Sequence, residues 1–376
     1  ARLTQGHHDM RRLLLGLVAP LTLASLVAST ELAAQTRVKR YDVTKETDYG
    51  IVYRLPETQL SFVLEVREQH YQPGSLAAYA DKYLGRRVEG EPQHSYRLES
   101  ARAVLTGIPD ETQQFLIAFD RKTVAPFVLL TDKGILYSIN GSEELPADQA
   151  QQIPLTELRS EQQPDQTSPA LPREYSQAGT RASRAEIAAN YLYELRESSM
   201  NVLTGAVDNM PKDGESMRLV LDRLRHEEAR TLRLFAGDTT QRLVAHRIDY
   251  LPTGEDLEAY TLARFSPSLG LLEPSDLRGT PITLSIKALE RADELDEKAE
   301  RRHEKQLENS IVYCRPGLAL VRLSWEGKTL LQEKVPLTQL GALQALAPKM
   351  LNLNQGKTTS IYLDTRTGAV RQIKQE

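Results

Sequence analysis

The chain has 376 residues, of which 40% are hydrophobic and 26% are charged, a composition typical of globular proteins and a length sufficient for two domains. Its 47 basic and 51 acidic residues give a formal net charge of −4. This balance excludes the broad positive surface that would neutralise phosphates, so we expect no nucleic acid partner.

The N-terminal residues predict export from the cytoplasm. The basic pair Arg11 and Arg12 precedes an apolar run, LLLGLVAPLTLASLVA (residues 13–28), which has the length of a signal-peptide core. The run is too short to span a hydrocarbon layer of about 30 Å comfortably, and Pro20 interrupts it. We therefore predict a cleavable signal peptide over residues 10–34, in preference to a retained anchor, and no transmembrane span in the mature chain.

The residues around this segment refine the expected compartment. Ala34 is a reasonable cleavage position, and residues 1–9 are interpreted as an upstream extension, so His7 and His8 are not interpreted as a metal site. Cys314 is the only cysteine, which allows no intramolecular disulfide and no lipid-bearing cysteine after the apolar run. We expect a periplasmic protein, or one held at the outer membrane through another protein.

Residues 36–141 have the pattern of a β-rich domain. Apolar and polar residues alternate in GIVYRLPETQL, SFVLEVREQHY, SYRLESARAVL and QFLIAF, as they do in half-buried strands. One short helix is expected in PGSLAAYADKYLG, with Ser75 as its N-cap and Gly85 as its left-handed stop. Residues 132–134, Asp-Lys-Gly, predict a hairpin turn.

Residues 142–182 differ in composition from the sequence before them. Prolines recur among Gln, Glu and Ser with little apolar periodicity, so the segment is not expected to bury enough surface to offset the entropy of ordering. We predict an extended interdomain linker.

Residues 183–376 predict an α+β domain. The phrase S-R-A-E from Ser183 has the pattern of a capping box, and a second amphipathic segment covers residues 216–235. Together they predict an antiparallel helical hairpin over residues 183–237, followed by β-rich sequence over residues 240–376.

Residues 289–308, within this β-rich part, are nearly all charged. Their few apolar side chains lie close to one narrow stripe, which favours a solvated helical excursion between two strands. A short coiled-coil contact with a partner is the alternative.

An internal repeat is visible in two pairs of phrases. GIVYRLPETQL (50–60) and SIVYCRPGLAL (310–320) share Ile, Val, Tyr, Pro and Leu in register. LLTDKGILYSI (129–139) and LDTRTGAVRQI (363–373) share Leu, Thr, Gly and Ile positions. The pattern predicts two related β units that bracket the helical hairpin. Alternatively, unrelated strand-turn-strand segments converge on the same residue types.

Several long phrases together resemble one protein family. They are GIVYRLPETQLSFVLEV, YQPGSLAAYADKYLG, IAANYLYELRESSMNVLTGAVDNMPKDGESMRLVLDRL, EEARTLRLFAG, RFSPSLGLL and SIVYCRPG. The chain is similar over about Tyr41 to Lys374 to the domain of unknown function 4831 (DUF4831) family, exported proteins of Bacteroides-type Gram-negative bacteria. The resemblance implies a signal peptide and an envelope location, and it implies no activity, ligand or catalytic residue.

No established catalytic or metal-binding motif occurs in the sequence. The phrases HEEAR (226–230) and HEKQL (303–307) lack the second histidine of a zincin helix, and nucleophile-elbow, Walker and dinucleotide motifs are missing. Acidic residues are interleaved with Lys or Arg, so chain order reveals no carboxylate pair. We assign no catalytic, cofactor-binding or metal-binding residue and expect no cofactor. The expected mature chain has five histidines, and no two of them lie at zinc-ligand spacing; they are His70, His94, His226, His246 and His303.

Cys314 and the tyrosines are the remaining candidates for chemistry. Cys314 stands where the first repeat has Arg54, in an apolar strand phrase, so a buried inert thiol is favoured over a nucleophile. Tyrosines suit sugar or peptide recognition, but core positions in strands are the favoured interpretation. The first domain concentrates several of them, among them Tyr49, Tyr53, Tyr71, Tyr79 and Tyr83.

These patterns predict an α+β protein of two β-rich domains with an internally repeated strand-hairpin unit, the second domain carrying an antiparallel helical hairpin. The favoured function is a non-catalytic exported cell-envelope component that binds or assembles through protein contacts, since the linker would let two modules engage one partner. One alternative is a periplasmic hydrolase acting on glycan or peptide, favoured by a deep cleft lined by two carboxylates or by Cys314 with a histidine. The other is a carbohydrate-binding module, which would have coplanar exposed tyrosines on one sheet face.

Overall fold

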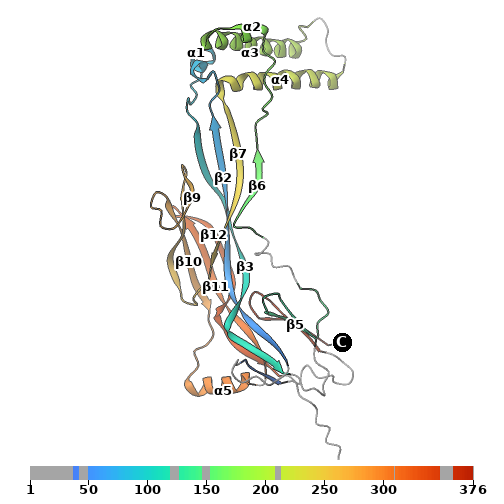
Figure 1. Ribbon diagram of the computed structural model, residues 1–376, viewed down its shortest axis with the longest axis vertical. Coiled ribbons are helices and arrows are strands. Elements are labelled where there is room, and N and C mark those ends of the chain that lie inside the picture. Colours follow the sequence, from blue (N-terminus) through green and yellow to red (C-terminus); the bar gives the residue numbers. More distant parts are fainter. Residues whose placement is uncertain are drawn as a thin grey trace, which may run out of the picture. The chain divides into compact units, whose positions relative to one another are not determined.

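Long antiparallel strands form the framework of the protein (Figure 1). The computed structural model describes residues 37–41, 50–118, 127–145, 153–207, 213–308, 310–347 and 359–375. The predicted upstream extension with His7 and His8, and the predicted signal peptide, lie outside the described residues. Within the described ranges, no helix has the length and apolar character needed to cross a membrane.

The first sheet joins strands that are far apart along the chain. Its order is β1-β3-β2-β7-β6, and each neighbouring pair is antiparallel. The strands are β1 (Arg37–Arg40), β2 (Gly50–Gln72), β3 (Gln93–Ala118), β6 (Thr156–Gln162) and β7 (Asp238–Tyr250). Strand β2 therefore lies at the centre, paired on one side with a strand from beyond the predicted linker.

Residues 142–182 contain a strand and a helix where their composition predicts an extended linker. Strand β6 pairs with β7, and α2 (Arg173–Gln177) packs on the helix that follows it. The difference arises because backbone hydrogen bonds to β7 hold β6 although its side chains are mostly exposed, and composition does not record a partner strand. The domain boundaries stay a prediction, while residues 35–376 form one compact unit.

The second sheet packs face to face on the first. Its order is β12-β11-β10-β8-β9. Leu60, Phe62 and Leu64 alternate along β2 and are fully buried against Ile282 and Leu284 of β10, so the period-two pattern seen in the sequence builds the main core. The strands are β8 (Leu257–Ser266), β9 (Gly270–Leu272), β10 (Thr280–Glu290), β11 (Ile311–Trp325) and β12 (Lys328–Leu346).

The third sheet consists of two short hairpins, one from each half of the chain. Its order is β14-β13-β5-β4, with β4 (Val128–Leu130), β5 (Leu136–Ile139), β13 (Thr359–Leu363) and β14 (Val370–Gln375). The predicted turn at 132–134 lies between β4 and β5, where Gly134 has a φ of +79°. A second core joins this sheet to the ends of β2, β3 and β11 through residues such as Tyr53, Ile117 and Ile311.

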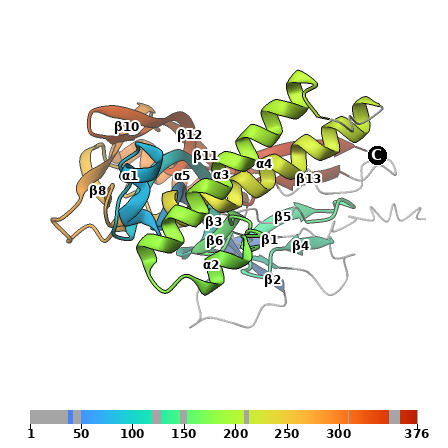
Figure 2. The same cartoon turned by 90° about the horizontal axis from the view of Figure 1, so that it is seen from above.

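Apart from α2, the helices lie within or close to the residues that the sequence predicts, with different caps. A 3-10 turn (Ala77–Tyr79) and α1 (Ala80–Leu84) end at Gly85, with φ +62°, but Ser75 is not the N-cap, because the cap position is Leu76. Helix α3 (Arg181–Thr204) begins before Ser183, since the Thr180 side chain accepts from the Ser183 amide. Helix α4 (Gly214–Ala236) lies beside α3 (Figure 2).

Only part of the charged segment 289–308 is helical. Strand β10 continues to Glu290, and α5 (Glu297–Leu307) begins after the Asp296 cap. Helix α5 has no buried residue, as expected of a solvated excursion between two strands.

Candidate binding pocket at a strand junction

The β2–β3 ladder is interrupted near its lower end in Figure 1. Arg54 pairs with Gln114, and the next pair is Pro56 with Pro109, so residues 110–113 are looped out of the ladder. Pro56 has no backbone N–H to donate, which makes this a natural place for pairing to break. The bulge exposes side chains on a strand that is otherwise paired along its length.

The β11–β12 ladder has an interruption of the same size. Arg315 pairs with Ala342, and the next pair is Gly317 with Leu337, so residues 338–341 are looped out. The break again lies at a proline, Pro316, which has no partner in the ladder.

Hydrogen bonds through Thr58 join the two interruptions. The Thr58 amide donates to Oγ1 of Thr338 at 2.9 Å, and Nε2 of Gln339 donates to the Thr58 carbonyl at 3.0 Å. Oγ1 of Thr58 donates to the carbonyl of Arg366, in the β13–β14 turn, at 2.9 Å. Because Thr58 is fully buried, these bonds position the two bulges firmly against each other.

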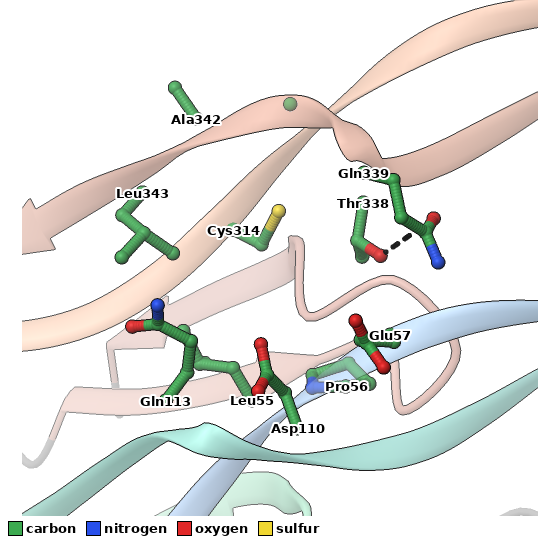
Figure 3. Close-up of a pocket in the computed structure, with 11 residues that line it drawn as sticks. Leu55, Pro56, Glu57, Asp110, Gln113, Cys314, Thr338, Gln339, Ala342 and Leu343 are labelled. Atoms are coloured by element: carbon green, nitrogen blue, oxygen red, sulfur yellow. Dashed lines mark hydrogen bonds between the residues drawn. The ribbon is translucent and has the colours of Figure 1, made fainter. Parts of the chain in front are cut away.

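A pocket of about 190 Å³ lies between the two bulges. Figure 3 shows side chains of β2 and β3 on one side, and of β11 and β12 on the other. The polar lining residues are Glu57, Asp110, Gln113, Thr338 and Gln339. The others are Leu55, Pro56, Cys314, Gly341, Ala342 and Leu343.

The two carboxylates make the pocket lining negative. Burial, and then the neighbouring Asp110, raise the pKa of Glu57. One oxygen of Asp110 accepts from the amide and hydroxyl of Thr112, at 2.7 and 2.6 Å. Glu57 has no hydrogen bond or ion pair in the described part of the chain, and the one basic group bonded to the lining is Arg40, which donates to Oε1 of Gln113 at 3.1 Å.

Cys314 borders this pocket as a buried thiol. The residue is 4% exposed, and burial raises the pKa of its thiol to about 12. Its amide donates to the carbonyl of Gly368 at 3.0 Å, which is an ordinary structural role. The described residues that line the pocket include no histidine beside the thiol.

None of the described histidines lines this pocket, and only two of them lie side by side. His70 and His94 are cross-strand partners whose rings stack at 4.3 Å between centroids. His246 is half-buried on β7, and burial lowers its pKa. His226 and His303 lie on α4 and α5, and the described residues hold no cluster of three or more metal-ligating side chains.

The tyrosines are mainly structural in the described ranges. Tyr53 is fully buried, and its hydroxyl accepts from the Val312 amide at 2.9 Å and donates to the Val312 carbonyl at 3.1 Å. Tyr79 and Tyr83 pack against the core beneath α3, and Tyr71 donates to the Ala236 carbonyl at 3.0 Å. The predicted Tyr49 lies outside the described residues.

Sequence reasoning missed the pocket because its two carboxylates are 53 positions apart and neither belongs to a motif. The usable signal was the proline in each repeated phrase, since Pro56 and Pro316 both mark where a ladder breaks.

Comparison with known proteins identifies a family. The family model described as domain of unknown function (DUF4831) matches residues 49–371. No curated protein and no solved structure matches the chain significantly.

Proposed function

The chain belongs to the DUF4831 family, a domain of unknown function, and we propose that it is an exported, non-catalytic component of the cell envelope that binds or assembles through protein contacts. Export is part of this proposal and is based on the segment over residues 10–34.

The observation that carries the proposal is the surface of the α3–α4 hairpin away from the sheets. We call residues 193–204 and 214–224 the far half of the hairpin. Large apolar side chains are exposed there, with Leu219 71% exposed, Met200 59% and Leu203 58%. Exposed apolar side chains gathered at one end of a helix pair are typical of contacts with another protein.

These side chains are not needed to attach the hairpin, because the opposite half does so. Ala185, Ala188 and Phe235 are buried against Leu76 and Ala80. The chain also approaches α4 very closely at Gly74, where an added Cβ would lie 2.2 Å from the Leu234 carbonyl oxygen. The far half therefore carries apolar surface that is free of a structural role in the sheets.

A charged cluster further holds the hairpin to the segment before it. Nε of Arg230 lies 2.8 Å from Asp165, and a buried carboxylate, Glu227, accepts from the Ala170 amide. Hydrogen bonds from Thr167 and Arg230 hold the pKa of Asp165 well below its usual range. The half of the hairpin nearest the sheets is thus held in place by several contacts, and the far half extends from it.

Co-purification from native envelopes tests the proposal. Envelopes would be solubilised from cells that make the tagged full-length protein, its Leu219→Asp variant, or the control Glu258→Gln on β8. We expect one or more envelope proteins to be retained with the wild type and the control, and lost with Leu219→Asp, while all three melt at similar temperatures. Recovery of monomer alone from wild-type envelopes would contradict the proposal.

We further propose that the two halves descend from one duplicated β unit. The support is the pair of ladder breaks of equal size and the matched turn contacts, since Arg54 donates its amide to Gly134 and Cys314 donates its amide to Gly368. In this proposal the two units are the β-rich parts on either side of the helical hairpin, residues 36–141 and 240–376, and strands of both units share the first and the third sheet. Excising residues 142–237 with a short linker and finding a folded remainder would support it, and an unfolded remainder would count against it.

A periplasmic hydrolase is the second candidate, because Glu57 and Asp110 both face the pocket. The raised pKa of Glu57 beside a second carboxylate is the arrangement used by a general acid. Release of products from peptidoglycan fragments by the wild type, lost in Glu57→Gln, would establish this activity and displace the non-catalytic proposal.

A further inference from the structure

Arg54 and Cys314 occupy matching positions in the two repeated phrases. Each donates its backbone amide to the carbonyl of the glycine in the adjacent hairpin turn, Gly134 at 2.9 Å and Gly368 at 3.0 Å. Each also lies within one residue of a ladder break. The two side chains differ completely in length and charge, although their backbones are held in the same way.

The Arg54 guanidinium shows what such a position can hold. Its Nη1 donates to the Lys133 carbonyl at 3.4 Å, and its Nη2 lies 3.5 Å from a carboxylate oxygen of Glu111, in the looped-out segment of β3. A guanidinium is therefore placed between a turn carbonyl and a carboxylate of the bulge.

At the matching position Cys314 has a short side chain without the positive charge of Arg54, and it borders the pocket (Figure 3). Its lining supplies the carboxylates of Glu57 and Asp110 together with the Thr338 hydroxyl. Glu57 has no basic partner in the described part of the chain, which is unusual for a carboxylate that is partly buried beside another. We propose that this pocket binds the guanidinium group of an arginine side chain supplied by another molecule.

The size of the pocket and its ligands favour an organic cation over a metal ion. A volume of about 190 Å³ exceeds what a bare ion fills. The lining has two carboxylates, and no cluster of three or more metal-ligating side chains occurs in the described residues. A planar guanidinium can bind carboxylates on two sides, whereas an ammonium is a point charge. The choice of guanidinium rests on the proposed duplication, through Arg54.

Short peptides provide the test. Acetyl-Gly-Arg-Gly-amide would be titrated into the full-length mature protein and followed by NMR, with the citrulline peptide as the neutral isostere. We expect the arginine peptide to bind and the citrulline peptide to bind at least about tenfold more weakly, since charge-assisted hydrogen bonds are the strong ones. Equal binding of the two peptides would overturn the proposal.

Variants locate the binding to the pocket. Glu57→Gln preserves shape and should weaken binding of the arginine peptide by about tenfold or more, whereas the exposed control Glu258→Gln should leave it unchanged. Cys314→Arg would place a guanidinium of the protein itself in the pocket and should prevent binding of the arginine peptide. If this variant does not fold, binding by Glu57→Gln tests the proposal by itself. Unchanged binding by Glu57→Gln, or displacement of the peptide by equimolar Ca²⁺, would overturn the proposal.

This outcome is separable from that of the proposed envelope contact. The pocket and the far half of the hairpin share no residue, so Leu219→Asp should bind the arginine peptide like the wild type. Failure of peptide binding with intact envelope co-purification would reject the pocket proposal alone.

Discussion

Thr58 and Thr338, 280 positions apart, exchange hydrogen bonds between their backbones and side chains. The Thr58 amide donates to Oγ1 of Thr338 at 2.9 Å, and the Thr338 amide donates to Oγ1 of Thr58 at 3.3 Å. The Thr338 hydroxyl thus satisfies the Thr58 amide, and the Thr58 hydroxyl satisfies the amide of Thr338, which lies in the looped-out segment of β12. This reciprocal pair holds the first and second sheets in register at the pocket.

Replacing either threonine with valine is expected to destabilise the fold. Thr58→Val and Thr338→Val each leave a backbone donor unsatisfied, at a cost of about 1–3 kcal/mol in the free energy of unfolding. The double variant should lose less than the sum, with a coupling of at least about 0.5 kcal/mol, because loosening one side weakens the other. Urea denaturation measures all three, and the exposed control Thr239→Val should change stability by less than about 0.5 kcal/mol.

The Tyr53 hydroxyl makes a second connection between the halves. Tyr53→Phe is expected to lower the free energy of unfolding by about 2–4 kcal/mol, since both the amide and the carbonyl of Val312 lose their buried partner. Tyr79→Phe is the matched control, because no hydrogen bond from its hydroxyl occurs in the described residues. Equal denaturation midpoints for the two variants would show that the hydrogen bonds of the Tyr53 hydroxyl do not stabilise the fold.

The thiol of Cys314 should be chemically inert in the folded protein. With its pKa raised to about 12, the thiolate fraction near pH 8 is lower than that of a free cysteine by on the order of 10³. We expect negligible labelling by Ellman's reagent in the native state and one thiol per chain after unfolding in urea. Rapid native labelling would indicate an activated cysteine and would favour an enzyme.

Glu57 should reduce stability at neutral pH. Because its folded pKa is raised, its contribution favours folding below the unfolded pKa and is lost as pH rises through the folded pKa. Glu57→Gln should therefore raise the free energy of unfolding at pH 7 by up to about 1 kcal/mol. The effect is small because solvent screens a carboxylate that is only partly buried, and it should shrink towards pH 4. A variant less stable than wild type at pH 7 would show that the carboxylate has a stabilising partner.

Local patterns in the sequence predicted much of the architecture. The alternation in SFVLEV became the fully buried face of β2, and Gly85 and the 132–134 turn lie where the residue types require. Cap assignment was less accurate, because Thr180 and Ser183 are both good acceptors and only the helix geometry distinguishes them.

Non-local features were beyond a single sequence. The pairing of β6 with β7 depends on partner residues about 80 to 90 positions away, and the exposed side chains of β6 give it no apolar signature. Glu57 and Asp110 come together because Glu57 pairs across the β2–β3 ladder with Ile108, close to Asp110, and no spacing rule along the chain records that meeting.

Site-specific crosslinking in cells tests whether the far half of the hairpin contacts an envelope protein. A photoreactive amino acid would replace Leu219 in the far half of the hairpin or, as a control, the exposed Glu258, in the full-length protein made by its native cells. We expect an adduct with a distinct envelope protein from position 219, absent from position 258 and lost when Met200→Asp is added. Adducts that are the same at both positions, or a protein that remains in the cytosol, would contradict the proposed function.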